Sequence, residues 1–258
     1  KRGDLVVEKG TRITPAIIGL LISVGVHTVP VILQPACTVI TTGNELVEPG
    51  VPLQSGQVYE SNSYTLLAAL KQMNIPTTKY LNQLDQLSAI SEAIQRSLEN
   101  SDLLLLTGGV SVGDYDFVAE ALARNGVRQI FHKVKQKPGK PIYFGMKGEK
   151  MIFGLPGNPG SVLTCFYLYV LPAIYCSMGA NLHAWQTYKI PLLQTIKKKE
   201  GLTHFIKAVW LQEGVQPLEH QESYKMNSFA QANAIIQLEE ERTIYDKGEL
   251  VDVFLLHT

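Results

Sequence analysis

The sequence predicts an α/β fold, a mostly parallel sheet with helices on both faces, followed by a small all-β C-terminal domain. The first observation is the stretch LLLLTGGVSVGDYD, residues 103–116, in which four leucines run directly into a glycine-rich segment. Only a strand covered on both faces tolerates such continuous hydrophobicity, so this run predicts a buried parallel strand that ends in a loop. The second is that short apolar runs alternate with helical patterns before Gly179, whereas mainly short β-like runs follow it.

In the α/β part, strands and helices are expected to alternate along the chain. The predicted strands span residues 36–42, 77–81, 103–106 and 151–155, and the predicted helices begin near residues 61, 86 and 117. The helix after Asp85 is the clearest, because its apolar residues recur at helical spacing. Upstream of these, Pro15 to Leu33 is expected to form a buried helix, a turn at Gly25 and a strand.

Composition limits the classes of partner. Lysine and arginine total 23 and so balance 23 aspartates and glutamates, which gives no electrostatic reason to expect nucleic acid or a membrane surface as partner. The apolar run Val162 to Met178 contains a proline and, in its middle, two tyrosines, which favours a core helix over a membrane span. The start of the chain does not resemble a signal peptide. The three cysteines have no metal-ligand spacing, so Cys37, Cys165 and Cys176 are expected to be reduced core residues in a cytoplasmic protein.

Polar or glycine-bearing segments follow each of the four predicted strands. These segments are Thr42–Glu45, Asp85, Thr107–Asp116 and Leu155–Pro159. Because the carboxyl ends of parallel strands meet at one edge of a sheet, all four are expected to lie together. Glycines let backbone N–H groups approach an anion, and the acids could hold a divalent cation that bridges phosphates. One such turn is more often a plain connection, but four at one edge favour a ligand site.

A lysine-rich segment adds positive charge. In HKVKQKPGKP, residues 132–141, strand alternation places Lys133, Lys135 and Lys137 on one face, and a Pro-Gly turn then presents Lys140. Two interpretations remain open. The lysines could be the solvated edge of a sheet, which discourages aggregation, or a cluster that neutralises a phosphate or oxyanion.

Five motifs, in this order and spacing, carry a specific resemblance: TTGNEL, GQVYESNSYTL, DLLLLTGGVSVGDYD, KPGKP and GLPGNPGSV. They resemble the molybdopterin molybdenumtransferase family, MoeA in bacteria and the E domain of gephyrin in animals, from about Gly3 to the end. The resemblance implies a MogA-like sheet and the insertion of molybdate into adenylylated molybdopterin with release of AMP. It also implies Mg²⁺ or another divalent cation, a homodimer in the full-length form, and possible contact with the upstream adenylyltransferase.

The family's site residues transfer by position. The resemblance implies catalytic roles for Glu45, Asp85, Asp116, Lys133 and Lys137, of which the three acids would also be metal ligands. It implies substrate contacts at Thr42, Gly43, Asn44, Gly108, Gly109, Ser111, Gly113, Lys140, Pro156, Gly157, Asn158 and Pro159. The sequence around Asp85, NQLDQ, departs from the family's usual glycine and paired acids.

The resemblance also divides the chain. Residues 1–35 correspond to the trailing part of an N-terminal arm region, residues 36–180 to the α/β molybdopterin-binding domain, and residues 186–258 to the β domain. Full-length relatives carry further residues before Lys1, so a shortened relative or an excised fragment is expected. An enzyme, a molybdopterin molybdenumtransferase, is expected because the sequence retains Glu45, Asp116 and both family lysines, and the alternative left open is a truncated, non-catalytic pterin-binding or scaffolding relative. The β domain is either a structural cap or, through a loop at 223–228, part of an active site.

Overall fold

The computed structural model describes residues 3–82, 86–109, 117–180 and 187–256. Its larger part is a six-stranded sheet in the order β4-β1-β5-β9-β8-β6. Four neighbouring strands run parallel, namely β4 (Thr77–Asn82), β1 (Cys37–Thr42), β5 (Leu103–Thr107) and β9 (Lys150–Leu155). The other two, β8 (Tyr143–Lys147) and β6 (Arg128–His132), are antiparallel. The expected mostly parallel sheet is confirmed.

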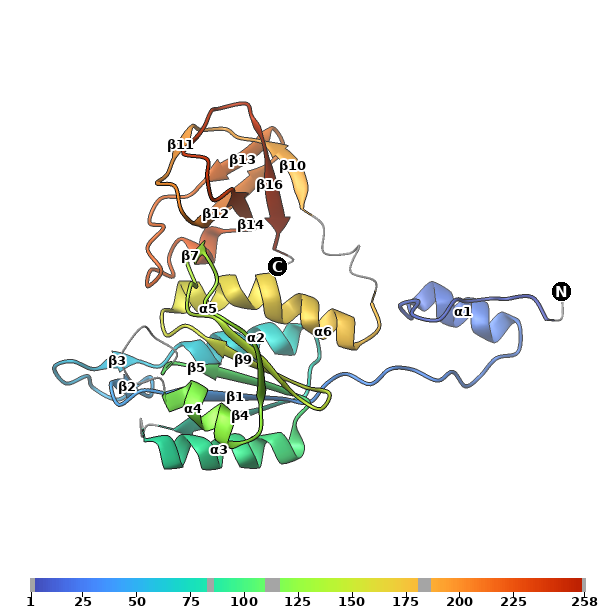
Figure 1. Cartoon of the computed structure of the whole chain (residues 1–258). Coiled ribbons are helices and arrows are strands. Elements are labelled where there is room, and N and C mark those ends of the chain that lie inside the picture. The colour runs from blue at the N-terminus through green and yellow to red at the C-terminus, as the bar shows by residue number, and fades with distance from the viewer. Residues whose placement is uncertain (1–2, 83–85, 110–116, 181–186, 257–258) are drawn as a thin grey trace.

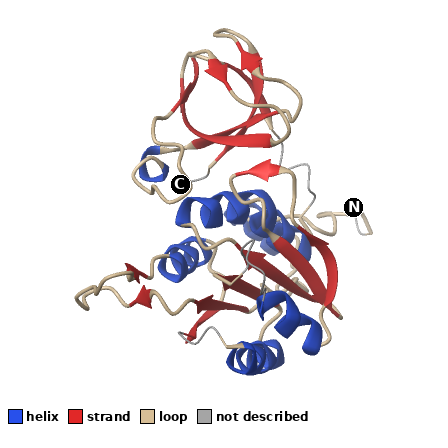
Figure 2. Cartoon of the chain, turned by 60° about the vertical axis from the view of Figure 1, so that its left-hand side comes forward, coloured by secondary structure: helices blue, strands red, loops and turns tan. Residues whose placement is uncertain are grey.

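Helices cover both faces of this sheet (Figure 2). One face packs against α2 (Asn62–Gln72), α5 (Pro159–Cys165) and α6 (Leu171–Ser177), and the other against α3 (Leu87–Asn100) and α4 (Phe117–Arg124). Leu103 and Leu105 of β5 belong to the first core, whereas Leu104 and Leu106 belong to the second. All four leucines are at most 1% exposed, which explains why the strand has no polar alternation.

The apolar run after β9 is a core helix, as expected. Pro159–Ser177 is one continuous helical run, in which the π-helical turn Phe166–Val170 joins α5 to α6 just before Pro172. Within the described ranges it is the one helix with the length and hydropathy of a membrane span, but 61% of that window is buried. Phe166, Val170 and Ile174 pack on the sheet. Burial inside the protein therefore accounts for its hydrophobicity.

The N-terminal segment differs from the expectation. Helix α1 (Pro15–Ser23) is capped by Thr14, whose hydroxyl accepts a hydrogen bond from the Ile17 amide at 3.3 Å, and a turn follows at Gly25, φ +84°. However, α1 has no buried residue, residues 26–36 form no strand, and the helix lies apart from the rest of the chain (Figure 1). The predicted buried helix and strand are therefore wrong. An apolar pattern reports which side chains avoid water but not what covers them.

The C-terminal part is a β domain with its own core. Its sheet has the order β10 (Tyr188–Pro191), β16 (Leu250–Leu255), β14 (Ala234–Leu238), β12 (Thr203–Leu211) and β13 (Gly214–Pro217). A smaller pair joins β11 (Ile196–Lys197) to β15 (Ile244–Tyr245), and a 3₁₀ turn, η3, spans Phe229–Gln231. The short strand β7 (Gln136–Lys137) pairs in parallel with β12 and so connects the two parts. A ribbon of β2 (Leu46–Val47) and β3 (Val58–Tyr59) projects from the α/β part (Figure 1).

Two of the three cysteines match the expectation. Cys37 and Cys165 are buried, and this burial raises the pKa of both thiols. Cys176 is exposed, so its assignment to the core is wrong. It occupies the last turn of α6, where the helix turns part of its surface away from the sheet.

Candidate active site

The carboxyl ends of the four parallel strands form a continuous edge. Register pairs Thr42 of β1 with Asn82 of β4, and Thr107 of β5 with Thr41 on one side and Leu155 on the other. The segments that follow β1, β5 and β9 therefore start side by side. This is the position at which open parallel sheets bind their ligands.

The turn after β1 brings a carboxylate over the strand end. Gly43 has φ +151°, and a Cβ at this position would lie 2.9 Å from Oε1 of Glu45. The Val58 amide donates a 2.9 Å hydrogen bond to the Glu45 carbonyl, which fixes the backbone of the turn. Glycine at 43 thus leaves room for the Glu45 side chain to fold back, and Asn44 and Glu45 are exposed at the edge.

The next two loops approach each other through glycines. Gly108 has φ +83°, and a Cβ there would lie only 2.0 Å from the carbonyl oxygen of Thr42. A Cβ on Gly157 would be 4.0 Å from the Cα of Gly108, so the loop after β9 lies beside the loop after β5. Gly109 is also left-handed, with φ +63°. Such closely packed glycine backbone suits the approach of an anionic ligand to N–H groups.

Buried polar atoms concentrate beneath this edge. Among the described residues, four buried side-chain oxygens there make no hydrogen bond: the hydroxyls of Thr41, Thr42 and Thr107, and Oδ1 of Asn62. The Asn62 Nδ2 donates a 2.8 Å hydrogen bond to the Gly157 carbonyl. The cap residue of α2 is Ser61, and Asn62, the first residue of the helix, ties α2 to the glycine loop through this bond, a contact that no sequence pattern indicates.

A cavity of about 650 Å³ adjoins the edge. It is bordered by three segments, Gln136–Pro141, Pro156–Asn158 and Gln221–Ser223, together with Ser161 and Leu202. The loop after β9 belongs both to this cavity and to the strand edge, because Gly157 lines the first and neighbours Gly108 in the second. Exposed Lys137 and Lys140 supply positive charge to its wall. The cavity therefore suits an anion that extends from the glycine loops.

The β domain contributes one wall of this cavity. The Gly160 amide donates to the Ser223 carbonyl at 2.8 Å, and Asn158 Nδ2 donates to Ser223 Oγ at 2.9 Å. These bonds join the start of α5 to the loop at 221–223. The domain is therefore more than a structural cap, since its loop and the α/β part enclose the cavity together.

The predicted lysine face is wrong. Lys133 has φ +66°, so the backbone turns there, and β6 and β7 are separate strands. As a result Lys133 is exposed but does not line the cavity, and Lys135 pairs with Glu240 at 2.8 Å. Lys137 is held at the cavity because Gln136, buried beneath it, accepts from Tyr169 and donates to the Pro138 carbonyl at 3.0 Å. Burial raises the pKa of Tyr169 to about 12, so its hydroxyl remains a donor.

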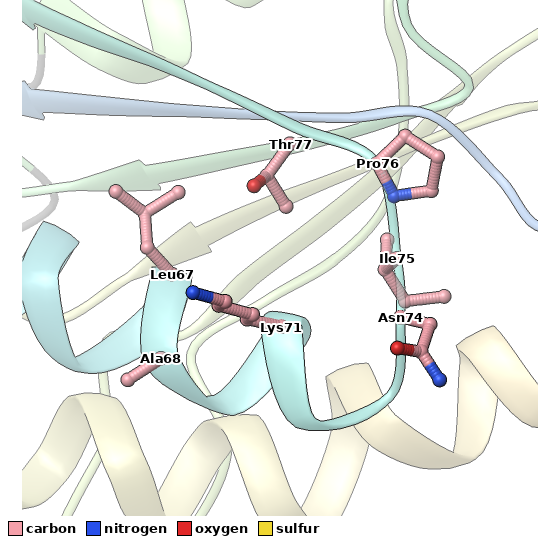
Figure 3. A pocket seen from close by; sticks show the side chains of 7 residues that line it. All are labelled: Leu67, Ala68, Lys71, Asn74, Ile75, Pro76 and Thr77. Carbon is pink, nitrogen blue, oxygen red and sulfur yellow. The ribbon is translucent and has the colours of Figure 1, made fainter.

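A second hollow, of about 540 Å³, lies between the end of α2 and the start of β4 (Figure 3). Leu67, Lys71 and Thr77 border it. Thr77 is the first residue of β4, so this hollow lies at the amino end of the parallel strands. It is separate from the glycine loops at their carboxyl ends.

Comparison with known proteins agrees with this geometry. Residues 38–175 match the model of a probable molybdopterin binding domain, and residues 189–256 match the MoeA C-terminal region (domain IV). The chain belongs to the molybdopterin molybdenumtransferase family. A curated molybdopterin molybdenumtransferase of Staphylococcus epidermidis is 36% identical over 259 residues, which cover 99% of this chain and 62% of the relative. One of Haemophilus influenzae is 34% identical over 264 residues, covering 98% and 64%.

A solved structure of this family has the same fold. The MoeA protein of molybdopterin biosynthesis from Pyrococcus horikoshii superposes with a TM-score of 0.83 at 28% identity, covering 99% of this chain and 63% of that one. The chain thus spans less than two thirds of the length of these molybdenumtransferase relatives.

Four of the site residues predicted for this chain lie outside the described residues: Asp85, Ser111, Gly113 and Asp116. Among the residues that are described, no group of three or more His, Cys, Asp or Glu side chains could hold a metal ion. Of the three acids predicted to hold the divalent cation, Glu45 is the one among the described residues. Its exposed carboxylate at a strand end, beside glycine backbone, fits the usual Mg²⁺ site, in which one or two carboxylates act together with substrate phosphates.

Proposed function

We propose that this chain inserts molybdate into adenylylated molybdopterin and releases AMP, and that the reaction takes place where the glycine loops meet the cavity. The observation that carries this proposal is that the loop after β9 connects the glycine loops to the cavity, because Gly157 adjoins Gly108 and also lines the cavity. The diphosphate would bind across the glycine loops, and the pterin and molybdate would extend toward Lys137 and Lys140. Family membership supports this choice of substrate.

Each group in the site has a role in this reaction. Water attacks the adenylate phosphorus, the bond from that phosphorus to the bridging oxygen breaks with the molybdopterin phosphate as the leaving group, and AMP, which carries the water's oxygen, is released. N–H groups at Gly108 and Gly109 and the ammonium groups of Lys137 and Lys140 would stabilise the oxyanions. Glu45, with Asp85 and Asp116, would hold Mg²⁺ or another divalent cation, which neutralises phosphate charge when bound.

Partners and location follow as further parts of the proposal. A homodimer of the full-length form is supported by the exposed apolar side chains of the N-terminal segment, such as Leu5, Ile22 and Leu33. Contact with the adenylyltransferase that makes the substrate, and a cytoplasmic location, accord with a biosynthetic role.

The test is a reconstitution. The purified chain is incubated with adenylylated molybdopterin, molybdate and Mg²⁺, while AMP is quantified and cofactor is detected by activation of a cofactor-free molybdoenzyme. We expect equal amounts of AMP and active cofactor. Binding of the pterin without AMP release would favour the alternative, a non-catalytic pterin-binding or scaffolding relative. Absence of both would contradict the proposal.

A further inference from the structure

A buried lysine in the β domain lies behind the cavity wall. Lys207 of β12 is only 5% exposed and does not line the cavity. Lysine is rarely buried to this degree unless its ammonium is paired. The surroundings of Lys207 therefore need an explanation.

The ammonium of Lys207 is satisfied by backbone carbonyls. Its Nζ donates to the carbonyl oxygens of His220 at 2.9 Å, Glu222 at 3.3 Å and Lys225 at 3.2 Å. An ammonium has three N–H donors, so its donors match these three acceptors in number. All three acceptors lie in the loop that carries Ser223.

The backbone of Lys207 holds the same loop. Its amide donates to Gln221 Oε1 at 2.9 Å, and its carbonyl accepts from Gln221 Nε2 at 2.8 Å and from the Leu218 amide at 3.0 Å. The peptide bonds that precede Gln221 and Ser223 are trans, so their N–H groups point away from the carbonyls of His220 and Glu222. The carbonyls face the ammonium, and the N–H groups of two cavity-lining residues face away from it.

We infer that Lys207 is a positioning residue for the proposed reaction: it draws the carbonyls of loop 219–228 inward and so fixes Gln221 and Ser223 as the wall of the substrate cavity. This inference rests on the proposed function. It assigns to Lys207 no contact with substrate. Its effect passes through Ser223, which the α/β part binds through Asn158 and Gly160.

The first test does not depend on the reaction. Lys207→Met keeps an unbranched apolar side chain and removes the ammonium, and amide hydrogen exchange is then measured. We expect exchange in segment 219–228 to quicken by about tenfold, because the loop opens more often, while β14 exchanges as before. The matched control is Lys198→Met, because the Lys198 ammonium also donates to three carbonyls, those of Lys199, Leu202 and Glu240, outside this loop. It should leave segment 219–228 unchanged.

The second test separates binding from chemistry. In the AMP-release assay, Lys207→Met should raise KM for adenylylated molybdopterin by about tenfold and change kcat by less than about twofold. Lys207→Arg, which retains a cationic donor, should have a KM close to that of the wild type. If Lys207→Met does not fold, Lys207→Gln replaces it under the same criteria.

Each outcome decides the inference. Unchanged exchange in segment 219–228, or an unchanged KM, would overturn it. A kcat that falls with KM constant would also overturn it, because that result indicates a direct role in the chemical step. If the wild-type chain releases no AMP, the proposed function fails, and the exchange experiment still determines whether Lys207 positions the loop.

Discussion

The amide nitrogen of Gly160 lies 2.8 Å from the carbonyl oxygen of Ser223, and this hydrogen bond joins the first turn of α5 to a loop of the β domain. Glycine is required at 160 for a simple reason. A Cβ there would also lie 2.8 Å from the Ser223 carbonyl oxygen, closer than real Cβ contacts. The contact between the two parts therefore depends on the absence of a side chain.

We predict that Gly160→Ala pushes the Ser223 loop away and weakens pterin binding. Forcing a methyl group into such a contact costs about 1–3 kcal/mol of unfolding free energy. Thermal denaturation and titration calorimetry measure the two effects. Gly19→Ala is the control, because a Cβ at Gly19 of α1 meets no atom within 4 Å. Equal behaviour of the two variants would show that the Gly160 contact is unimportant.

Gly108→Ala tests the glycine loop itself. The new Cβ would lie 2.0 Å from the Thr42 carbonyl oxygen, so we predict that the loop is displaced and that pterin affinity falls by at least about tenfold. Gly56→Ala is a matched control, because Gly56 has nearly the same φ, +82°, but open space around it. Both variants bear the cost of a left-handed alanine, about 1–2 kcal/mol, so the difference between them isolates the close approach. Unaltered affinity in Gly108→Ala would remove this loop from the binding site.

Lys137→Ala tests the charge at the cavity. We expect the free energy of pterin binding to weaken by about 1–3 kcal/mol, the value of a charge-assisted hydrogen bond. Lys147→Ala removes an equally charged, exposed side chain at the far end of β8 and should have no effect. If calorimetry gives the same affinity for both variants, Lys137 is a solvated surface residue.

More of the fold than of the candidate site could be predicted from the sequence. The Leu103–Leu106 run and the helical spacing from Leu87 to Leu98 depend on local periodicity, and both elements are confirmed. Lys133 and Lys137 lie in different places because Lys133 itself has a left-handed backbone, which no sequence pattern predicts. Asn62 contacts Gly157 in the loop after β9, and Ser223 contacts Asn158 at the start of α5. Both pairs are far apart in the sequence, so only tertiary packing shows these contacts.

His204 should make stability depend on pH. Burial lowers the pKa of His204 below its usual 6.5, and Lys198 and Lys137 lower it further. The unfolded chain therefore binds more protons than the folded chain at this residue, so stability falls as pH drops through 6.5 toward the folded-state pKa. Denaturation between about pH 7.5 and pH 5 should show a smaller loss for His204→Gln than for wild type. The exposed residue His27 provides the control, His27→Gln. A loss of stability in His204→Gln as large as in wild type would contradict this prediction.

The most direct measurement is AMP release by Glu45→Gln. Gln keeps the shape of the side chain that folds over Gly43 but removes its charge, so the melting temperature should change little while AMP release and cofactor formation fall by at least about a hundredfold. Glu149→Gln, an exposed acid in the turn between β8 and β9, should retain wild-type rates. Wild-type turnover in Glu45→Gln would contradict the assignment of the reaction to this edge of the sheet.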